Sequence, residues 1–376
     1  MVSTCEMRFV GALFLTFLFS LNKPGIKLNI LQAITVCFTA YGTIHLILQI
    51  CLIMGNLLAL RFYRNIKLAF VMNLLILYAY RYSNIQKSGT YDITGFLMIF
   101  IIKMCYVTKY YDGDFTKILQ YILFVPGLIT GPVALYEEFK NLYYNKGKQN
   151  KAYTSKDTLR DFPRIMLVAC LYSFAPKEYL LDKIRFGSFL PFQLFYLTIY
   201  NIVNRCKFYF AWYFADVCFK LMGFHGYLNI LWRNVELTES VKELAANWNK
   251  FMSRFLKEFV FLEMTKKYSK FISALAVYVV SSLLHSYEIS VLIFFISFAI
   301  SNYLINVANN FVKSRICRII QMSLFISYFS LPFYLRDTKK TFEIWSSIHF
   351  YMQIYLLIMF LILQLGSIIK KLIKSK

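Results

Sequence analysis

The stretch SALAVYVVSSLLHSYEISVLIFFISFAIS, residues 273–301, decides the class of fold. It consists of two apolar runs that meet around His285, and Glu288 is its one carboxylate. A helix needs roughly 20 apolar residues to cross a bilayer, where every backbone polar group must be paired within the protein. The stretch therefore predicts membrane helices and an all-α polytopic membrane protein.

Similar apolar runs recur along the whole chain, and none of the connections between them indicates a domain boundary. We therefore expect one integral membrane domain, residues 1–376, with roughly ten or eleven membrane helices. Several runs are short or contain Pro and Gly, so re-entrant or tilted segments are expected. The candidate spans are residues 8–22, 28–58 (one long or two short helices), 66–80, 93–108, 117–136, 164–180, 188–204, 206–224, 271–285, 289–312, 316–335 and 345–369.

Composition supports a membrane protein and excludes two other classes. Of the 376 residues 59% are hydrophobic and only 16% are charged, which argues against both a soluble enzyme and a disordered polyelectrolyte. The 42 Lys and Arg outnumber the 19 Asp and Glu. These cations punctuate apolar runs, as in RFYRNIK at 61–67, which is typical of cytoplasmic loops rather than of a nucleic-acid face. No nucleic-acid partner is expected.

Metal and nucleophile motifs are missing from the sequence. The eight cysteines form no CxxC pair, and no two histidines lie within one helical turn. We predict neither a disulfide framework nor a metal site. A GxSxG elbow, a Walker loop and a GxGxxG are also absent. Any catalysis must use few groups on a membrane scaffold.

Two polar stretches interrupt the apolar runs. Residues 137–164 are rich in Lys, Asn and Tyr and are expected to form an exposed loop. Within residues 234–270, apolar side chains recur at steps of three and four between Val241 and Phe259, which predicts one amphipathic helix. Such a helix lies beside a membrane or covers a cavity, since its polar face cannot cross lipid.

Four histidines are candidates for chemistry within this scaffold: His45, His225, His285 and His349. An ionisable group at membrane depth costs about 2.5–3.5 kcal/mol on insertion scales, so its presence often indicates function. A hydrogen-bonded core histidine is the alternative interpretation for each. His285 lies deepest between apolar runs and has polar neighbours on both flanks, so it is the best candidate for a base.

Three sequence blocks carry a resemblance to a known family. YILFVPGLITGPVALYEEF, residues 121–139, resembles the Phe-x-Pro, Gly-Pro, Tyr pattern of the membrane-bound O-acyltransferase superfamily. IIKMCYVTKYYDGD, residues 101–114, is similar to that superfamily's span with a lysine, here Lys103, and an Asp-Gly turn. NVELTESVKELAANWNKFMSRFLKEFVF, residues 234–261, resembles the porcupine branch. The resemblance covers about residues 90–320 and is strongest over 234–290.

The resemblance implies a bundle with an internal tunnel for a fatty chain and two catalytic residues. His285 would be the general base, and Asn249 would orient the substrate or donate a hydrogen bond to the charge that develops on the thioester oxygen. Trp248, Ser282 and Lys103 are substrate-binding candidates, although Trp248 also fits a packing role and Lys103 a structural one. The family usually has Gly after its histidine, whereas this chain has Ser286.

The resemblance also implies substrates and a location. Acyl-CoA would be a co-substrate rather than a bound cofactor, and the acyl group, palmitoleoyl, would go to a serine of a secreted Wnt-type protein. Besides these partners the chain would contact membrane lipid, as a multi-pass protein of the endoplasmic reticulum.

Two other functions are left open. The same scaffold also suits a lysophospholipid or sterol acyltransferase, which transfer to a lipid acceptor would identify. A transporter or non-enzymatic scaffold is a third interpretation. It leads one to expect inverted repeats or charge pairs at mid-membrane, and the sequence displays neither.

Overall fold

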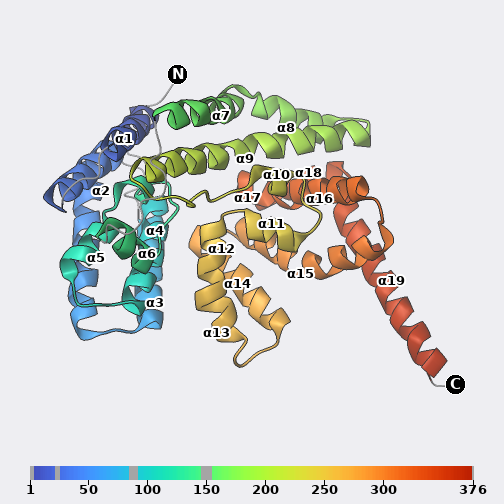
Figure 1. Ribbon diagram of the computed structural model, residues 1–376. Helices are drawn as coiled ribbons and strands as arrows, with labels where there is room; N and C mark the ends of the chain where they lie inside the picture. The colour runs from blue at the N-terminus through green and yellow to red at the C-terminus, as the bar shows by residue number, and fades with distance from the viewer. Residues whose placement is uncertain (1–3, 22–25, 84–91, 145–154, 375–376) are drawn as a thin grey trace. The chain divides into compact units, whose positions relative to one another are not determined.

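A computed structural model describes residues 4–21, 26–83, 92–144 and 155–374 (Figure 1). Within these ranges the regular elements are all helical, with no strand. The all-α prediction is confirmed. The chain divides into two compact units, residues 1–166 with 210–229 and residues 167–209 with 230–376. Helices α7 (Ser155–Phe174) and α9 (Leu190–Leu221) contribute residues to both.

Among the described residues, seven elements of the first unit precede α7. They are α1 (Thr4–Ser20), α2 (Ile26–Phe62), α3 (Ile66–Tyr82), α4 (Thr94–Lys109), α5 (Phe115–Ile122), the 3-10 turn η2 (Val125–Gly127) and α6 (Tyr136–Tyr143). Helix α2 is bent at Gly42, whose φ of 79° and ψ of −179° are not helical. The sequence left one long or two short helices open here, and the structure has one helix with a kink, where glycine adopts a backbone that other residues avoid.

The 101–139 blocks fold together in the first unit, where the candidate span 93–108 forms α4 as predicted and the candidate span 117–136 does not form one helix. Residues 117–136 do not form one helix, because α5 ends at Ile122 and a 3-10 turn with extended backbone follows. Pro126 and Pro132 lack the amide hydrogens that a continued helix requires, which accounts for the break. Phe124 fills the resulting turn and packs edge-on against Phe139 and Phe219, with ring centroids 5.2 and 5.6 Å away.

The second unit contains the remaining helices. They are α8 (Lys177–Phe186), α10 (Trp232–Glu236), α11 (Val241–Asn247), α12 (Lys250–Leu256), the π turn η3 (Lys257–Phe261), α13 (Leu262–Met264), α14 (Lys270–His285), α15 (Ile289–Phe311), α16 (Arg315–Phe329), α17 (Leu331–Leu335), α18 (Thr338–Ser347) and α19 (Tyr351–Lys374). Helices α14 and α15 pack on each other, and α17 packs on α15. This arrangement places the turn after α14 against α17.

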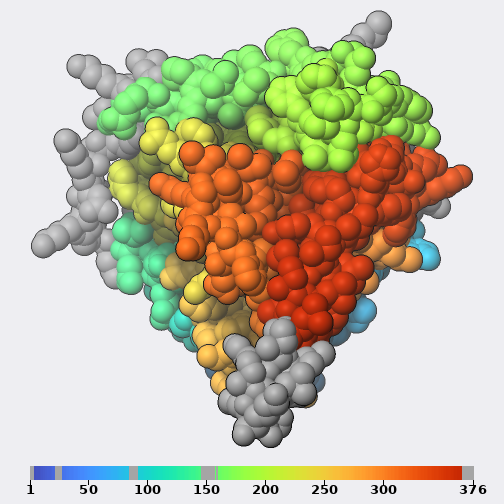
Figure 2. All heavy atoms as spheres, turned by 90° about the vertical axis from the view of Figure 1, so that its right-hand side faces the viewer, coloured from blue at the N-terminus to red at the C-terminus, as the bar shows by residue number. Residues whose placement is uncertain are grey.

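Helix α8 packs against α18, one of the C-terminal helices of the same unit (Figure 2). Its light green atoms lie against the red atoms of the C-terminal region in that view. The Nε2 of Gln193 donates to the carbonyl oxygens of Ile184 (2.7 Å) and Ser347 (3.3 Å). Arg185 and Glu343 form an ion pair at 2.6 Å. Gln193 is buried, whereas the ion pair is exposed, so the hydrogen bonds of Gln193 contribute most to fixing the packing of α8.

The number of clear spans differs from the expected ten or eleven. Among the described residues, three helices are long and apolar enough to cross a membrane, Leu28–Phe62, Ile289–Phe311 and Arg315–Leu335. A fourth arises if α18 and the start of α19, bent by 75°, count as one span. Other predicted spans form shorter helices, carry charges or are interrupted, as at 117–136.

Two further boundaries correct the sequence analysis. The candidate spans 188–204 and 206–224 form the single helix α9, Leu190–Leu221. Its proline, Pro191, lies in the first turn, where proline is tolerated, and no Gly or Pro interrupts the chain from Phe192 to Leu221. The expected exposed loop at 137–164 is helical at both ends, in α6 and α7. Its residues 145–154 lie outside the described ranges.

Candidate active site

His285 is the last residue of α14, at the turn into α15. Ser269 caps the start of this helix, since its hydroxyl oxygen accepts from the amide of Ile272 at 3.3 Å. The helix ends because Ser286 adopts extended backbone, and the Ser286 amide donates to the carbonyl of Ser282 at 2.9 Å. The imidazole is thereby placed at a helix end, on a backbone fixed on both sides.

Aromatic rings form the surroundings of the His285 imidazole. Phe295 of α15 stacks on it at 5.5 Å between centroids, and Phe333 of α17 meets it edge-on, also at 5.5 Å. The residue is half-buried. Apolar walls limit access of water to the imidazole, which suits a neutral base acting on a lipid-linked substrate.

Ser286, the departure from the family's glycine, fits its position without strain. Its φ of −168° and ψ of 163° are open to any residue, so glycine is not needed there. The side chain is buried, and its hydroxyl oxygen accepts from the amide of Glu288 at 3.1 Å. The serine therefore stabilises the turn that leads from His285 to α15.

Asn249 does not lie on one continuous amphipathic helix, and that prediction was wrong. The helix breaks into α11 and α12 at Trp248 and Asn249. Asn249 has a left-handed backbone, with φ of 46° and ψ of 56°, and its Oδ1 accepts from the amide of Met252 at 3.4 Å. Asparagine tolerates this conformation and caps helices well, which explains the break at this residue.

Ring contacts connect the Trp-Asn motif with the surroundings of the candidate base. Trp248 packs edge-on against Phe208 and Tyr209 of α9, with centroids 5.4 and 6.2 Å away. Phe208 in turn lies 6.5 Å from Phe333, which touches His285. Trp248 and His285, far apart in sequence, thus border one aromatic cluster within the second unit.

Ser282 and Lys103 are placed differently from each other. Ser282 is buried one helical turn before His285 in the second unit. Lys103 belongs to α4 in the first unit, where its Nζ donates to the carbonyls of Tyr121 (3.1 Å) and Ile122 (2.8 Å). These two carbonyls belong to the last two residues of α5, so the ammonium of Lys103 caps the end of this helix, which is a structural role. Binding of substrate by either residue stays a prediction.

A buried ion pair was missed in the sequence analysis. The guanidinium of Arg205 in α9 donates to both carboxylate oxygens of Glu236, at 2.8 and 2.6 Å, and Tyr209 donates to the same carboxylate. Burial raises the pKa of Glu236, but the charge and hydrogen bonds of Arg205 and the Tyr209 hydroxyl outweigh it, so the net pKa lies below the ordinary value. Glu236 is the glutamate of the Asn-Val-Glu-Leu stretch at residues 234–237, and this motif is the sequence signal that could have drawn attention to it.

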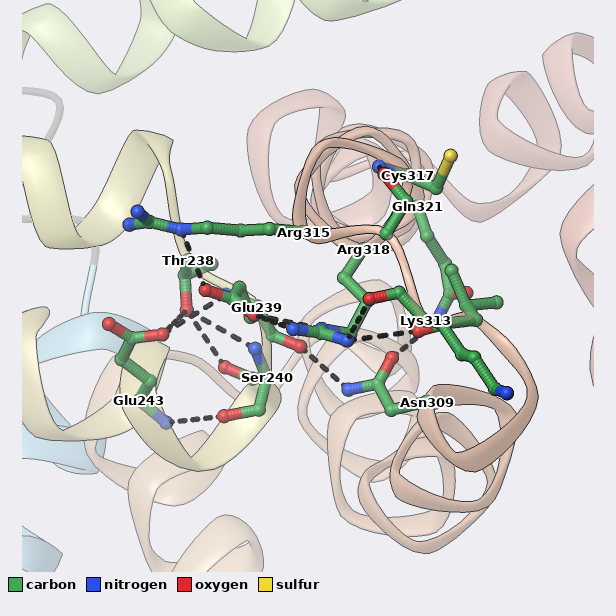
Figure 3. A network of polar contacts seen from close by, with 12 residues as sticks. Thr238, Glu239, Ser240, Glu243, Asn309, Lys313, Arg315, Cys317, Arg318 and Gln321 are labelled. Carbon is green, nitrogen blue, oxygen red and sulfur yellow. Dashed lines mark hydrogen bonds and ion pairs between the residues drawn. The ribbon is translucent and has the colours of Figure 1, made fainter.

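A second polar network fixes the loop between α10 and α11 (Figure 3). Glu239 accepts from Arg315 at 3.0 Å and from Arg318 at 2.8 Å. Its backbone carbonyl accepts from the amide nitrogen of Asn309 at 2.8 Å. Hydrogen bonds from Arg318 and Arg315 lower the pKa of the Glu239 carboxyl. The network ties the loop after Glu236 to the turn between α15 and α16.

The other histidines lie in varied settings. His45 is fully buried, with Nδ1 3.0 Å from the carbonyl of Tyr41 and Nε2 2.9 Å from the hydroxyl of Tyr80, so the core interpretation is confirmed for it. His349 is exposed at the bend before α19. His225 lies half-buried in the loop that follows α9. In the described ranges, no three His, Cys, Asp or Glu side chains converge as metal ligands.

Comparison with known families gives one match over most of the chain. The profile of MBOAT, the membrane-bound O-acyltransferase family, matches residues 28–314. The match begins well before residue 90, where the resemblance in the sequence first became readable. It includes His285, Asn249, Trp248, Ser282 and Lys103.

Three curated relatives are similar to this chain. The lysophospholipid acyltransferase of Saccharomyces cerevisiae is 24% identical over 356 residues, which cover 73% of this chain and 57% of the relative. The lysophospholipid acyltransferase of Schizosaccharomyces pombe is 24% identical over 370 residues, 79% of this chain and 72% of the relative. The membrane-bound glycerophospholipid O-acyltransferase 2 of Gallus gallus is 25% identical over 288 residues, 64% and 54%. The chain thus spans little more than half of two of these relatives.

Proposed function

Because the chain belongs to the membrane-bound O-acyltransferase family, we propose that it transfers a fatty acyl group from acyl-CoA to the free hydroxyl of a lysophospholipid. The observation that carries this proposal is the similarity to two lysophospholipid acyltransferases over about three quarters of the chain. Acceptor, donor and product all contain hydrocarbon chains that partition into a bilayer, so an enzyme embedded in the membrane can reach all three. We place the reaction in the endoplasmic reticulum membrane, as the family resemblance implies.

His285 is the residue to which we assign proton transfer. An alcohol is a poor nucleophile at neutral pH, so a base must remove its proton as the oxygen attacks the thioester carbonyl. The C–O bond to the acceptor forms and the C–S bond of the thioester breaks. The imidazolium then gives the proton that it took from the alcohol to the leaving sulfur, so that CoA leaves as the free thiol. General-base help of this kind contributes about 10²- to 10⁴-fold in rate. The helix-end position and aromatic walls of His285 support this role.

Asn249 is the candidate for stabilising charge on the thioester oxygen. A positioned amide donor can serve as part of an oxyanion hole, worth about 10²- to 10³-fold. Its left-handed backbone holds the side chain at the start of α12, next to Trp248 and the aromatic cluster. Asn249 thus caps α12 through its Oδ1, and we propose that its side-chain NH₂ group is the donor to the thioester oxygen.

Transfer to a serine of a secreted Wnt-type protein is the second candidate function. The observation that favours it is the block at residues 234–261, with its Asn-Val-Glu-Leu opening and Trp-Asn pair, which resembles the porcupine branch. A lysophospholipid and a serine both present a primary or secondary hydroxyl, so the same base serves either acceptor. The comparisons favour the lipid acceptor, since the three curated relatives reported above are named for phospholipid substrates.

An acceptor panel tests the proposal. The purified protein is given radiolabelled oleoyl-CoA or palmitoleoyl-CoA with a lysophospholipid, a sterol or a serine-bearing Wnt-like peptide. We expect labelled phospholipid as the product. Transfer to the peptide alone would establish the second candidate, and transfer to the sterol alone would change the acceptor class.

The His285→Ala variant tests the assignment of the base in the same assay. We expect its rate to fall by about 10²- to 10⁴-fold while it stays inserted in the membrane. His349→Asn is the matched control, because His349 is exposed, has a φ of 57°, and asparagine tolerates that backbone. Full activity of His285→Ala would contradict the role of this imidazole.

A further inference from the structure

Lys207 of α9 is a cation of the second unit that forms no ion pair with a carboxylate of the described residues. Its Nζ lies 5.0 Å from the ring centroid of Phe208 and 5.7 Å from that of Tyr334. The residue is partly buried, and Tyr334 adjoins Phe333 at the end of α17. Aromatic faces attract an ammonium, but a buried charge is normally also paired with an opposite charge.

The charges around Lys207 add to its excess rather than cancel it. The charged side chains that act on it are Arg336, which follows α17, and Lys177, which begins α8, and both are cations. Among the described residues no Asp or Glu oxygen lies within ion-pair distance of Lys207. The nearby Glu236 is bound by Arg205, and Glu288 lies 3.9 Å from Arg336. Three cations, from α8, α9 and the turn after α17, therefore act together, and of the two carboxylates nearby one is bound by Arg205 and the other reaches only Arg336.

This cationic cluster, Lys177, Lys207 and Arg336, borders the surroundings of the candidate base. Phe333 touches His285, and the next residue, Tyr334, is the ring below Lys207. Phe208, the other ring at Lys207, contacts Phe333 as well. Glu288, which reaches Arg336, is three residues from His285 in the chain. An anion bound by the cluster would be separated from the imidazole by little more than these rings.

We propose that the cationic cluster binds the phosphate of the acceptor, with Lys207 as its central ligand. The inference rests on the proposed function, since it assumes a lysophospholipid acceptor. A lysine ammonium binds phosphate as a point charge, and apolar walls strengthen the attraction by excluding water. Binding of the phosphate would give Lys207 the counter-charge that the protein itself does not supply.

The chemistry of the two substrates distinguishes the acceptor from the donor at this position. In a 1-acyl lysophospholipid the phosphate and the free hydroxyl are on adjacent carbons of the glycerol. In acyl-CoA the whole pantetheine arm separates the phosphates from the thioester. A phosphate site beside the base therefore suits the acceptor, whose hydroxyl must reach His285 at the same time.

Steady-state kinetics of the full-length protein test this site with two acceptors, lysophosphatidic acid and the phosphate-free 1-acylglycerol. We expect Lys207→Gln to raise KM for lysophosphatidic acid by about tenfold or more, because a charged hydrogen bond is worth that much or more in binding. KM for acyl-CoA and the rate with 1-acylglycerol should stay as in the wild type. Lys207→Arg, which keeps the charge, should restore most of the affinity, and Lys242→Gln on the exposed face of α11 is the control.

The outcomes separate the inference from the proposed function. If the wild type acylates neither these acceptors nor any other lysophospholipid, the proposed function is wrong. If it acylates lysophosphatidic acid but Lys207→Gln leaves its KM unchanged, or raises KM for acyl-CoA instead, the phosphate site at Lys207 is wrong. Should Lys207→Gln fail to fold, the wild type still decides: a KM for 1-acylglycerol equal to that for lysophosphatidic acid would overturn the inference, and a KM about tenfold higher would support it.

Discussion

Glu236 and Arg205 form a bidentate ion pair, in which the two guanidinium nitrogens lie 2.8 and 2.6 Å from the two carboxylate oxygens. The exposed fractions of the two side chains are only 19% and 4%. Removal of one member of a buried pair leaves the other charge unpaired in a medium of low polarity, which is costly. The pair also fixes α10 to α9, next to the rings that connect Trp248 with His285.

Glu236→Gln is therefore predicted to destabilise the protein strongly, by about 3–5 kcal/mol. The glutamine keeps the shape and part of the hydrogen bonding but leaves Arg205 with an uncompensated charge. Thermal unfolding of the purified protein in detergent measures the effect. Glu263→Gln is the control, because Glu263 pairs with Lys266 at a site where both side chains are more than half exposed, and such pairs contribute little. Equal melting temperatures for the two variants would contradict the prediction.

The same pair predicts a dependence of stability on pH. The folded-state pKa of Glu236 lies below its ordinary value of 4.5, so the pair stabilises fully above that value. The contribution is lost as the pH falls through the lower, folded-state pKa. We expect the difference in melting temperature between wild type and Glu236→Gln to be constant from pH 8 to about 5.5 and to shrink below about 4.5. A difference that grows on acidification would show the opposite sign of the shift.

Sequence reasoning predicted the fold class because hydropathy reports the solvent directly. The long run at 289–312 forms α15 nearly as expected, and the run at 316–335 forms α16 followed directly by α17. It failed where single residues decide, as at Pro126 and Pro132, which end a predicted span, and at Asn249, which breaks a predicted helix. Those breaks depend on backbone conformations that side-chain periodicity does not contain.

The site was predictable to a different extent for each residue. His285 stood out because an ionisable group between apolar runs is costly, and the rings around it could not be read from sequence spacing. Arg205 and Lys207 lie at or next to the point where the sequence analysis placed the boundary between two candidate spans, so their charges looked like those of an ordinary connecting loop, whereas the structure places both within α9. The importance of Arg205 follows from its partner Glu236, 31 residues away in the chain. That of Lys207 follows from its lack of an ion pair among the described residues, and both are facts of the tertiary structure.

Arg318 is predicted to matter more for stability than Arg315, although both bind Glu239. Arg318 also donates to the carbonyls of Val312 and Lys313, at 3.0 Å each, which satisfies the end of α15. The exposed fraction of its side chain is 25%, whereas that of Arg315 is 72%. We expect Arg318→Ala to lower the melting temperature clearly and Arg315→Ala to change it little. Both effects are measured at low and high salt, and only the Glu239 contribution should be screened; a larger effect of Arg315→Ala would contradict this ranking.

A three-variant series at Asn249 separates its structural role from its catalytic role. Asn249→Ala loses the cap on α12 and places a methyl group on a left-handed backbone, so we expect a loss of about 2 kcal/mol in stability. Asn249→Gly accepts the φ of 46° and loses only the side-chain cap, so it should be less destabilised. Asn249→Asp keeps the capping oxygen and should melt as the wild type does, while the amide donor is gone.

Activity of Asn249→Asp is the decisive measurement of the series. If the Asn249 amide stabilises the charge that develops on the thioester oxygen, kcat should fall by about 10²- to 10³-fold at an unchanged melting temperature, because a carboxylate repels that charge. The Gly variant should lose activity similarly despite its milder effect on stability. Wild-type kcat in Asn249→Asp would restrict Asn249 to capping α12, and would leave His285 as the one residue of the pair with a chemical role.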